Sequence, residues 1–113
     1  MFKTQQIGSI DVFTINEPLR GTAVSTIESA LLRLINEGQP HIVIDLEETS
    51  MIDSKGLELL MDLQNLAIQR GGAIRYCRPN NLVLEVLQLT GLDKSLCCYE
   101  TTTQALGAFA ESY

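Results

Sequence analysis

The sequence is poor in histidine and in basic residues. His41 is its only histidine, and eight Lys and Arg residues stand against fourteen Asp and Glu residues, which gives a net charge of −6. A lone histidine at the start of an apolar run offers no plausible catalytic triad, and we expect a protein that is not an enzyme. The negative charge disfavours a nucleic-acid duplex or an anionic membrane as partner. A protein with a basic or an apolar patch fits this charge better.

Long hydrophobic runs and paired cysteines are also missing. No apolar segment reaches the roughly 20 residues of a transmembrane helix, and the N-terminal "MFKTQQIGSID" lacks the apolar block of a signal peptide. We therefore expect a cytoplasmic protein without direct membrane insertion. Cys77, Cys97 and Cys98 are odd in number and match no zinc or redox spacing, so we interpret them as small buried hydrophobic residues.

Metal ligands in a recognisable spacing are absent too. Glu47, Glu48 and Asp53 stand close together in the sequence. Such a group of carboxylates is more often a solvated acidic loop than a cation site. We expect no metal and no cofactor.

What the sequence has is an alternation of strand-like and helix-like segments, in a length typical of one domain, residues 1–113. Strands are predicted over 2–7, 11–16, 41–46, 73–77 and 95–99, and helices over 23–37, 55–70, 79–91 and 101–112. The run "HIVIDL" is typical of a strand covered on both faces. Because crossovers between strands are right-handed, the later strands should be parallel. We predict an α/β fold with a small mixed sheet of about five strands and about four helices packed mainly on one face.

Apolar residues at helical spacing predict which helix faces enter the core. They are Val24, Ile27, Leu31, Leu34 and Ile35 in the first helix, Leu57, Leu60, Leu63 and Ala67 in the second, and Leu82, Val86 and Leu89 in the third. The closing helix should begin with a threonine cap.

The joint between strand 41–46 and the following helix ends in Asp-Ser-Lys-Gly. One interpretation is structural: Ser54 caps free backbone N–H groups, an interaction worth about 1 kcal/mol. The other is a switch in which Ser54 carries a phosphate. A helix N-terminus favours an anion, Lys55 would partly neutralise it, and Gly56 would permit a close approach. A phosphate would also add nearly two negative charges to an acidic surface, so a partner that accepts the hydroxyl would reject the phosphate.

The stretch "HIVIDLEETSMIDSKGLELLMDLQNLAIQRGGAIRYC" resembles the STAS domain of anti-sigma-factor antagonists. The pieces that carry the resemblance are Asp45-Leu46, Ile52, Asp53-Ser54-Lys55-Gly56-Leu57, Gly71-Gly72 and Ala73–Tyr76. The later "PNNLVLEVLQLTGLDKSL" is similar to the family's third helix, and "TTTQAL" to the start of its last. The resemblance covers about residues 5–110. A lone Asp-Ser-x-Gly is a weak motif, but between a strand and a helix it is specific.

The resemblance implies a STAS-like single domain that acts by binding an anti-sigma factor, which is also a serine kinase of the GHKL ATPase type. The kinase phosphorylates the serine of the motif, here Ser54, and the complex falls apart. A PP2C-type phosphatase restores binding. Asp53, Lys55 and Gly56 then lie on the partner-binding surface together with Ser54.

Two positions depart from the family's pattern. The residue after the acceptor is often Ser, Thr or Ala, and here it is Lys55, a bulky cation beside the hydroxyl. The family often carries Leu-Asp ahead of its first helix, and this chain has Leu19-Arg20, which reverses a charge near the partner-binding surface. Both departures concern phosphorylation and the choice of kinase and leave the fold unaffected.

Two other interpretations stay open. STAS domains also serve as non-phosphorylated scaffold subunits of signalling or transport complexes, and Lys55 and Arg20 favour this interpretation. A more remote alternative is a receiver-like domain phosphorylated on Asp45. That chemistry needs Mg²⁺ held by further carboxylates, and the early segment offers only Asp11 and Glu17, well separated.

Overall fold

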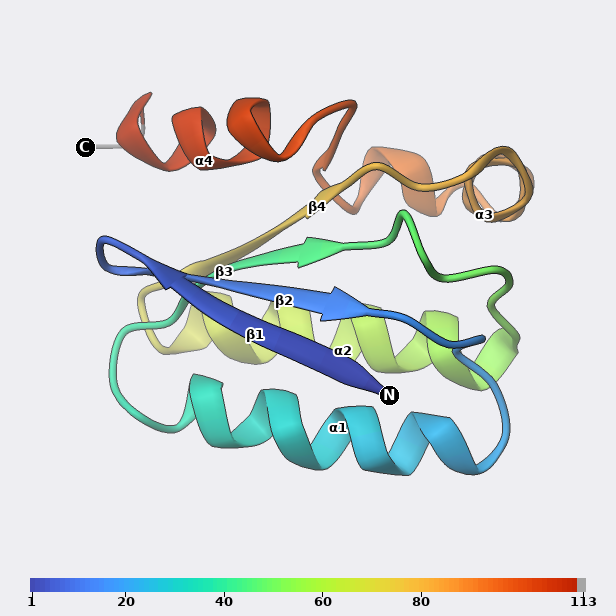
Figure 1. Cartoon of the computed structure of the whole chain (residues 1–113), viewed down its shortest axis with the longest axis horizontal. Coiled ribbons are helices and arrows are strands. Elements are labelled where there is room, and N and C mark those ends of the chain that lie inside the picture. The colour runs from blue at the N-terminus through green and yellow to red at the C-terminus, as the bar shows by residue number, and fades with distance from the viewer. Residues whose placement is uncertain (112–113) are drawn as a thin grey trace.

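The fold is built on one mixed sheet. The structure is a computed structural model that describes residues 1–111, without the side chains of the last two of these. The sheet contains β1 (Phe2–Ile7), β2 (Ile10–Ile15), β3 (His41–Asp45), β4 (Ala73–Cys77) and β5 (Cys98–Tyr99), in that order across the sheet. Figure 1 labels β1 to β4 in this order. β1 pairs antiparallel with β2, and the other neighbours pair in parallel. Ser112, expected in the last helix, and Tyr113, expected at the end of the domain, lie outside the described residues.

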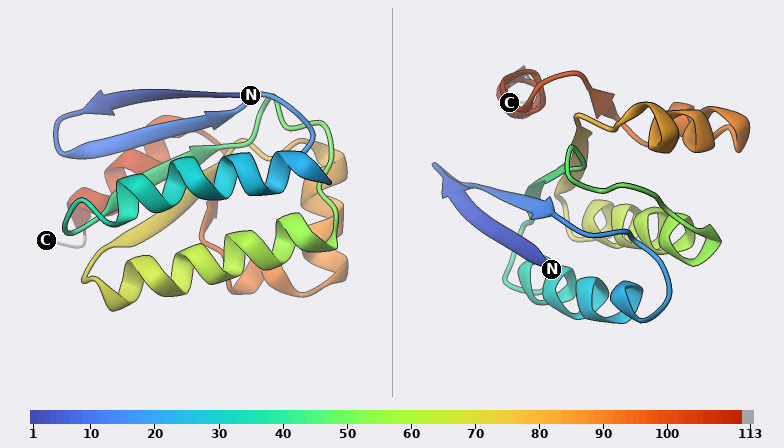
Figure 2. Two further views of the ribbon diagram at one scale, coloured as in Figure 1. Left: turned by 90° about the horizontal axis from the view of Figure 1, so that it is seen from below. Right: turned by 45° about the vertical axis from the view of Figure 1, so that its right-hand side comes forward.

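Helices cover both faces of this sheet, unequally. They are α1 (Thr22–Ile35), α2 (Ser54–Gln69), α3 (Asn81–Leu89) and α4 (Thr102–Glu111), with a 3-10 turn at Leu92–Lys94. α1 and α2 lie side by side on one face, and α4 lies on the opposite face (Figure 2). The predicted fold class, a five-stranded mixed sheet with helices mainly on one face, is confirmed. No helix of residues 1–111 is long and apolar enough to cross a bilayer.

The larger core lies between the sheet and the first three helices. The predicted apolar face of α2 is buried throughout, and α1 buries Ile27, Leu31 and Ile35 against the sheet, with Val24 and Leu34 partly buried. Tyr76 lies at the centre, where its hydroxyl donates to the Leu60 carbonyl at 3.0 Å. Burial raises the pKa of this phenol far above its ordinary value. Each Å² of apolar surface buried in this core stabilises the fold by about 25 cal/mol. The core therefore holds the strand ends and helix starts in fixed positions.

A smaller core lies under α4. Val43 and Cys77 on the sheet meet Ala105 and Phe109 on the helix. This second layer explains the continuous apolar run of β3, because side chains on both of its faces are buried. Thr101 caps α4, since its hydroxyl accepts a hydrogen bond from the Gln104 backbone N–H at 3.1 Å, and the threonine cap is confirmed.

Two predictions about burial are wrong. On α3, Leu82 is 52% and Leu89 80% exposed, whereas Val83 and Leu87 on the neighbouring stripe enter the core. Both stripes of this short helix are apolar, so the spacing alone could not choose between them. Among the cysteines, Cys77 is buried and Cys98 half-buried, but Cys97 is exposed. The last strand is also shorter than predicted, because the turn at Leu92–Lys94 continues into its predicted range: the backbone N–H groups of Ser95 and Leu96 both donate to the Leu92 carbonyl.

Candidate functional site

Ser54 lies at the carboxyl edge of the sheet, at the end of the loop that follows β3. β3 ends at Asp45 and α2 begins at Ser54 itself. The side chain is exposed. Within the described residues its hydroxyl makes no hydrogen bond. The serine hydroxyl is therefore accessible on a helix start whose backbone is fixed.

Asp53, and not Ser54, caps the helix. Asp53 has extended backbone, and its Oδ1 accepts a hydrogen bond from the Gly56 backbone N–H at 2.8 Å. The prediction that Ser54 is the cap is wrong, because the aspartate one residue earlier occupies the position from which a side chain reaches the third helical N–H. The Gly56 bond is the main cause that lowers the pKa of Asp53.

The second oxygen of Asp53 ties α2 to the loop before α1. Asp53 Oδ2 accepts from the Gly21 backbone N–H at 3.2 Å. Two backbone bonds accompany it: the Leu19 N–H donates to the Met51 carbonyl at 2.9 Å, and the Asp53 N–H donates to the Leu19 carbonyl at 3.2 Å. The loop that carries Arg20 thus runs directly beside the loop that carries Ser54.

Contacts within the chain explain why position 56 is a glycine. A Cβ at this position would stand 2.5 Å from the Leu19 carbonyl oxygen and 2.8 Å from Ile52 Cγ1. Gly56 is buried by these neighbours. The sequence interpretation, that Gly56 gives a partner close access to the helix, is therefore wrong: the group that approaches is Leu19 of the same chain.

The loop before Ser54 is held at two further points. The Thr49 hydroxyl is buried and donates to the Ile15 carbonyl at 2.8 Å. Asn80 Nδ2 donates to the Thr49 carbonyl at 2.9 Å, while Asn80 Oδ1 accepts from the Val83 N–H and caps α3. Sequence reasoning missed both residues. A sign of the second was present, since Asn directly before an apolar helix is a typical cap.

An ion pair joins the carboxyl ends of β3 and β4. Arg78 Nε donates to Asp45 Oδ1 at 3.2 Å and Nη2 donates to Asp45 Oδ2, while Nη1 pairs with Glu47. The hydrogen bonding of the guanidinium to Asp45 is the main cause that raises the pKa of Arg78. Asp45 is only 4% exposed. The carboxylate considered as a receiver acceptor is thus buried and held by a guanidinium.

Family comparisons agree with this architecture. A family model described as the STAS domain matches residues 1–105. The chain belongs to the STAS domain family. An anti-sigma F factor antagonist from Paenibacillus polymyxa is 33% identical over 66 residues, which are 58% of this chain and 56% of the relative. The chain spans less than two thirds of the length of the curated relatives that it matches.

Solved STAS structures superpose over nearly the whole chain. An anti-sigma-factor antagonist (STAS) domain protein from Planctomyces limnophilus is 28% identical with a TM-score of 0.85, covering 96% of this chain and 97% of that one. An anti-sigma factor antagonist from Mycobacterium paratuberculosis has a TM-score of 0.87 at 22% identity, covering 96% of this chain and 92% of that one. At that identity the second likeness shows the fold alone.

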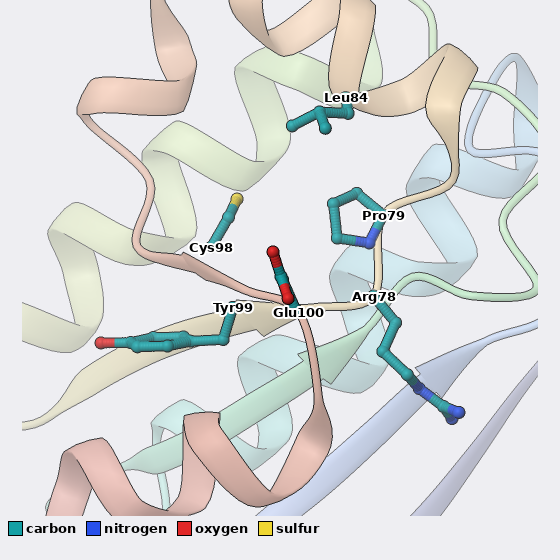
Figure 3. A pocket seen from close by; sticks show the side chains of 6 residues that line it. All are labelled: Arg78, Pro79, Leu84, Cys98, Tyr99 and Glu100. Carbon is teal, nitrogen blue, oxygen red and sulfur yellow. The ribbon is translucent and has the colours of Figure 1, made fainter.

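A pocket on this STAS domain lies apart from the predicted site residues. Its lining comes from the ends of β4 and β5 and from α3: Arg78, Pro79, Leu84, Cys98, Tyr99 and Glu100. Figure 3 shows the Arg78 guanidinium directed away from Leu84 and Cys98, in keeping with its bonds to Asp45. None of the residues predicted from the sequence as site residues lines this pocket.

Proposed function

We propose that this protein is an anti-sigma-factor antagonist that binds an anti-sigma factor and loses that binding when Ser54 is phosphorylated. The observation that carries the proposal is the exposed Ser54 hydroxyl, left without a capping role because Asp53 supplies the cap. The relatives named as anti-sigma factor antagonists support the same function. The proposed partner is a serine kinase of the GHKL type, with a PP2C-type phosphatase to reverse the modification, and the domain itself, residues 1–113, acts by binding.

The geometry suits a switch that works by charge at the surface. The loop before Ser54 is fixed by Thr49, Asn80 and Leu19, so a phosphate has little freedom to rearrange it. Phosphorylation would instead add a bulky group of nearly two negative charges to the exposed start of α2. The proposed partner-binding surface is completed by the residues around that start, Asp53, Lys55 and Arg20. Gly56 is buried beneath it and allows the close backbone contact with Leu19. Rejection of the partner then follows from repulsion and lost fit at one position.

A non-phosphorylated scaffold subunit of a signalling or transport complex remains the second candidate. Lys55 and Arg20 favour it, because two cations beside the hydroxyl change the surface that a kinase must recognise. The state of Ser54 in the cell distinguishes the two functions. Peptide mapping of the protein from its own cells, growing and stressed, should show a phosphate on Ser54 whose occupancy changes. An unmodified serine in a well-covered peptide favours the scaffold.

Binding variants test the proposed function directly. Tagged wild-type, Ser54→Ala and Ser54→Asp proteins are recovered from their own cells, and the amount of co-purified GHKL-type anti-sigma factor is measured by mass spectrometry. Ser54→Ala should retain this partner under all conditions, and Ser54→Asp should lose it. Ser50→Asp is the matched control, since Ser50 is an exposed serine of the same loop. Equal recovery with Ser54→Ala and Ser54→Asp contradicts the proposal.

A further inference from the structure

Arg20 is fixed beside Ser54 by its two neighbours in the chain. On one side, the Leu19 backbone bonds to residues 51 and 53. On the other side, the Gly21 N–H donates to Asp53 Oδ2. The backbone of Arg20, between these two residues, therefore lies beside Asp53, which immediately precedes Ser54. A long arginine side chain attached there lies within reach of the start of α2.

The guanidinium of Arg20 has only a weak partner. Its Nη1 lies 3.3 Å from the sulfur of Met51, and a thioether is a weak hydrogen-bond acceptor. Among the ion pairs of residues 1–111, none involves Arg20. The side chain is exposed, so little packing opposes its movement. A nearby phosphate would be a much stronger acceptor, because guanidinium and phosphate form two parallel charge-assisted bonds.

Lys55 is placed differently, although it follows Ser54 directly. It lines a shallow groove between α1 and α2 together with Val24, Glu28, Glu58, Leu59 and Asp62. Three carboxylates, of Glu28, Glu58 and Asp62, line the same groove, although among the ion pairs of the described residues none involves Lys55. A phosphate on Ser54 would have to compete with these carboxylates for Lys55, whereas at Arg20 it competes only with a thioether.

We propose that Arg20 binds the phosphate of phosphorylated Ser54, and that Lys55 stays in its acidic groove. The guanidinium leaves the sulfur of Met51 and moves to the phosphate oxygens. This inference rests on the proposed function, which makes Ser54 the acceptor. It adds a second consequence of phosphorylation, because the partner then meets a neutralised Arg20 held against the helix start, in place of a free cation.

The experiment uses the whole protein with phosphoserine inserted at position 54 during synthesis, so that it needs neither the kinase nor the partner. The second ionisation of the phosphate is followed by ³¹P NMR as a function of pH. Arg20 favours the dianion, so Arg20→Gln should move the titration midpoint upward by roughly half a pH unit, the size expected for an exposed ion pair. Lys55→Gln should move it clearly less.

Arg33→Gln is the matched control, since Arg33 is an exposed arginine at the far end of α1. It removes the same net charge and should leave the midpoint in place. An unchanged midpoint in Arg20→Gln overturns the inference, as does a larger movement in Lys55→Gln or an equal one in Arg33→Gln. None of these results bears on whether a kinase modifies Ser54 in the cell, so failure here is separate from failure of the proposed function.

Discussion

Arg78 donates hydrogen bonds to both carboxylate oxygens of Asp45, across the ends of two neighbouring parallel strands. Arg78 reaches this position with a φ of 55°, in the left-handed region, and its backbone N–H donates to the Tyr99 carbonyl at 2.9 Å. The pair therefore connects the ends of β3, β4 and β5 at the edge of the sheet from which the Ser54 loop departs.

Removal of the arginine should destabilise the fold markedly. Arg78→Ala leaves a nearly buried carboxylate without its partner, and we expect a loss of about 2–3 kcal/mol, below the usual cost for a fully buried pair because Arg78 is partly exposed. Glu47→Gln is the control; it removes only the exposed partner and should cost under about 1 kcal/mol. Urea unfolding measures both. A loss of equal size in the two variants would show that Asp45 does not depend on Arg78.

Gly56→Ala should be destabilising although the position lies in a helix. The added methyl group would stand 2.5 Å from the Leu19 carbonyl oxygen, and overpacking of this kind costs about 1–3 kcal/mol. Gly107→Ala is the matched control in α4, where no atom of the described residues, apart from the chain neighbours and the helix's own backbone, lies within 4 Å of the added group. There the same change should stabilise the protein by up to about 1 kcal/mol. Thermal unfolding that moved in the same direction for both would refute the role given to Leu19.

The cap at Asp53 should make stability depend on pH. Its pKa is lowered in the folded chain, chiefly by the bond from the Gly56 N–H, so the carboxylate stabilises the fold above the unfolded value of 3.8. That contribution is lost as pH falls through the lower folded value. Between neutral pH and about pH 3, wild-type stability should fall further than that of Asp53→Asn, which cannot titrate. Parallel pH profiles of the two thermal midpoints would rule out this contribution.

Asn80 should hold the Ser54 loop from a distance. Asn80→Ala removes the α3 cap and the bonds to the Thr49 and Ser50 carbonyls, with an expected cost of about 1–2 kcal/mol. Amide hydrogen exchange should rise in residues 49–53. The control is Asn81→Ala, the exposed residue next to it at the first position of the helix. If exchange in the loop stayed at the wild-type rate, the loop would have to be held by Thr49 and Leu19 alone.

The sequence was sufficient to predict where the main helices and strands lie, but not which of their faces would be buried. β3 and β4 could be predicted because a β-branched run and "AIRYC" have few alternatives, and the apolar face of α2 follows from its spacing. Leu82 and Leu89 were placed wrongly because both stripes of α3 are apolar. Spacing reports which residues share a face, whereas burial depends on the element that happens to pack there.

The chemistry of the site was predicted less completely for a similar reason. Local sequence points to Ser54, but the cap is decided by backbone angles one residue earlier, and Gly56 is explained by Leu19, which is far away in the chain. The pairing of Asp45 with Arg78 joins the last residue of β3 to the residue that follows β4. A search for charged residues at the ends of neighbouring parallel strands would have found this pair, since such ends meet at one edge of a sheet.

The restraints on the loop between β3 and α2 also bear on how fast and how tightly a partner binds. Hydrogen bonds from Thr49, Asn80 and Leu19 have already ordered this segment when the chain folds. A partner that docks on it has little backbone entropy left to remove, so more of the contact energy remains as affinity. The partner should then dock on it with little change of backbone conformation. The association rate would be set by collision and orientation, and differences in affinity would come mainly from the dissociation rate.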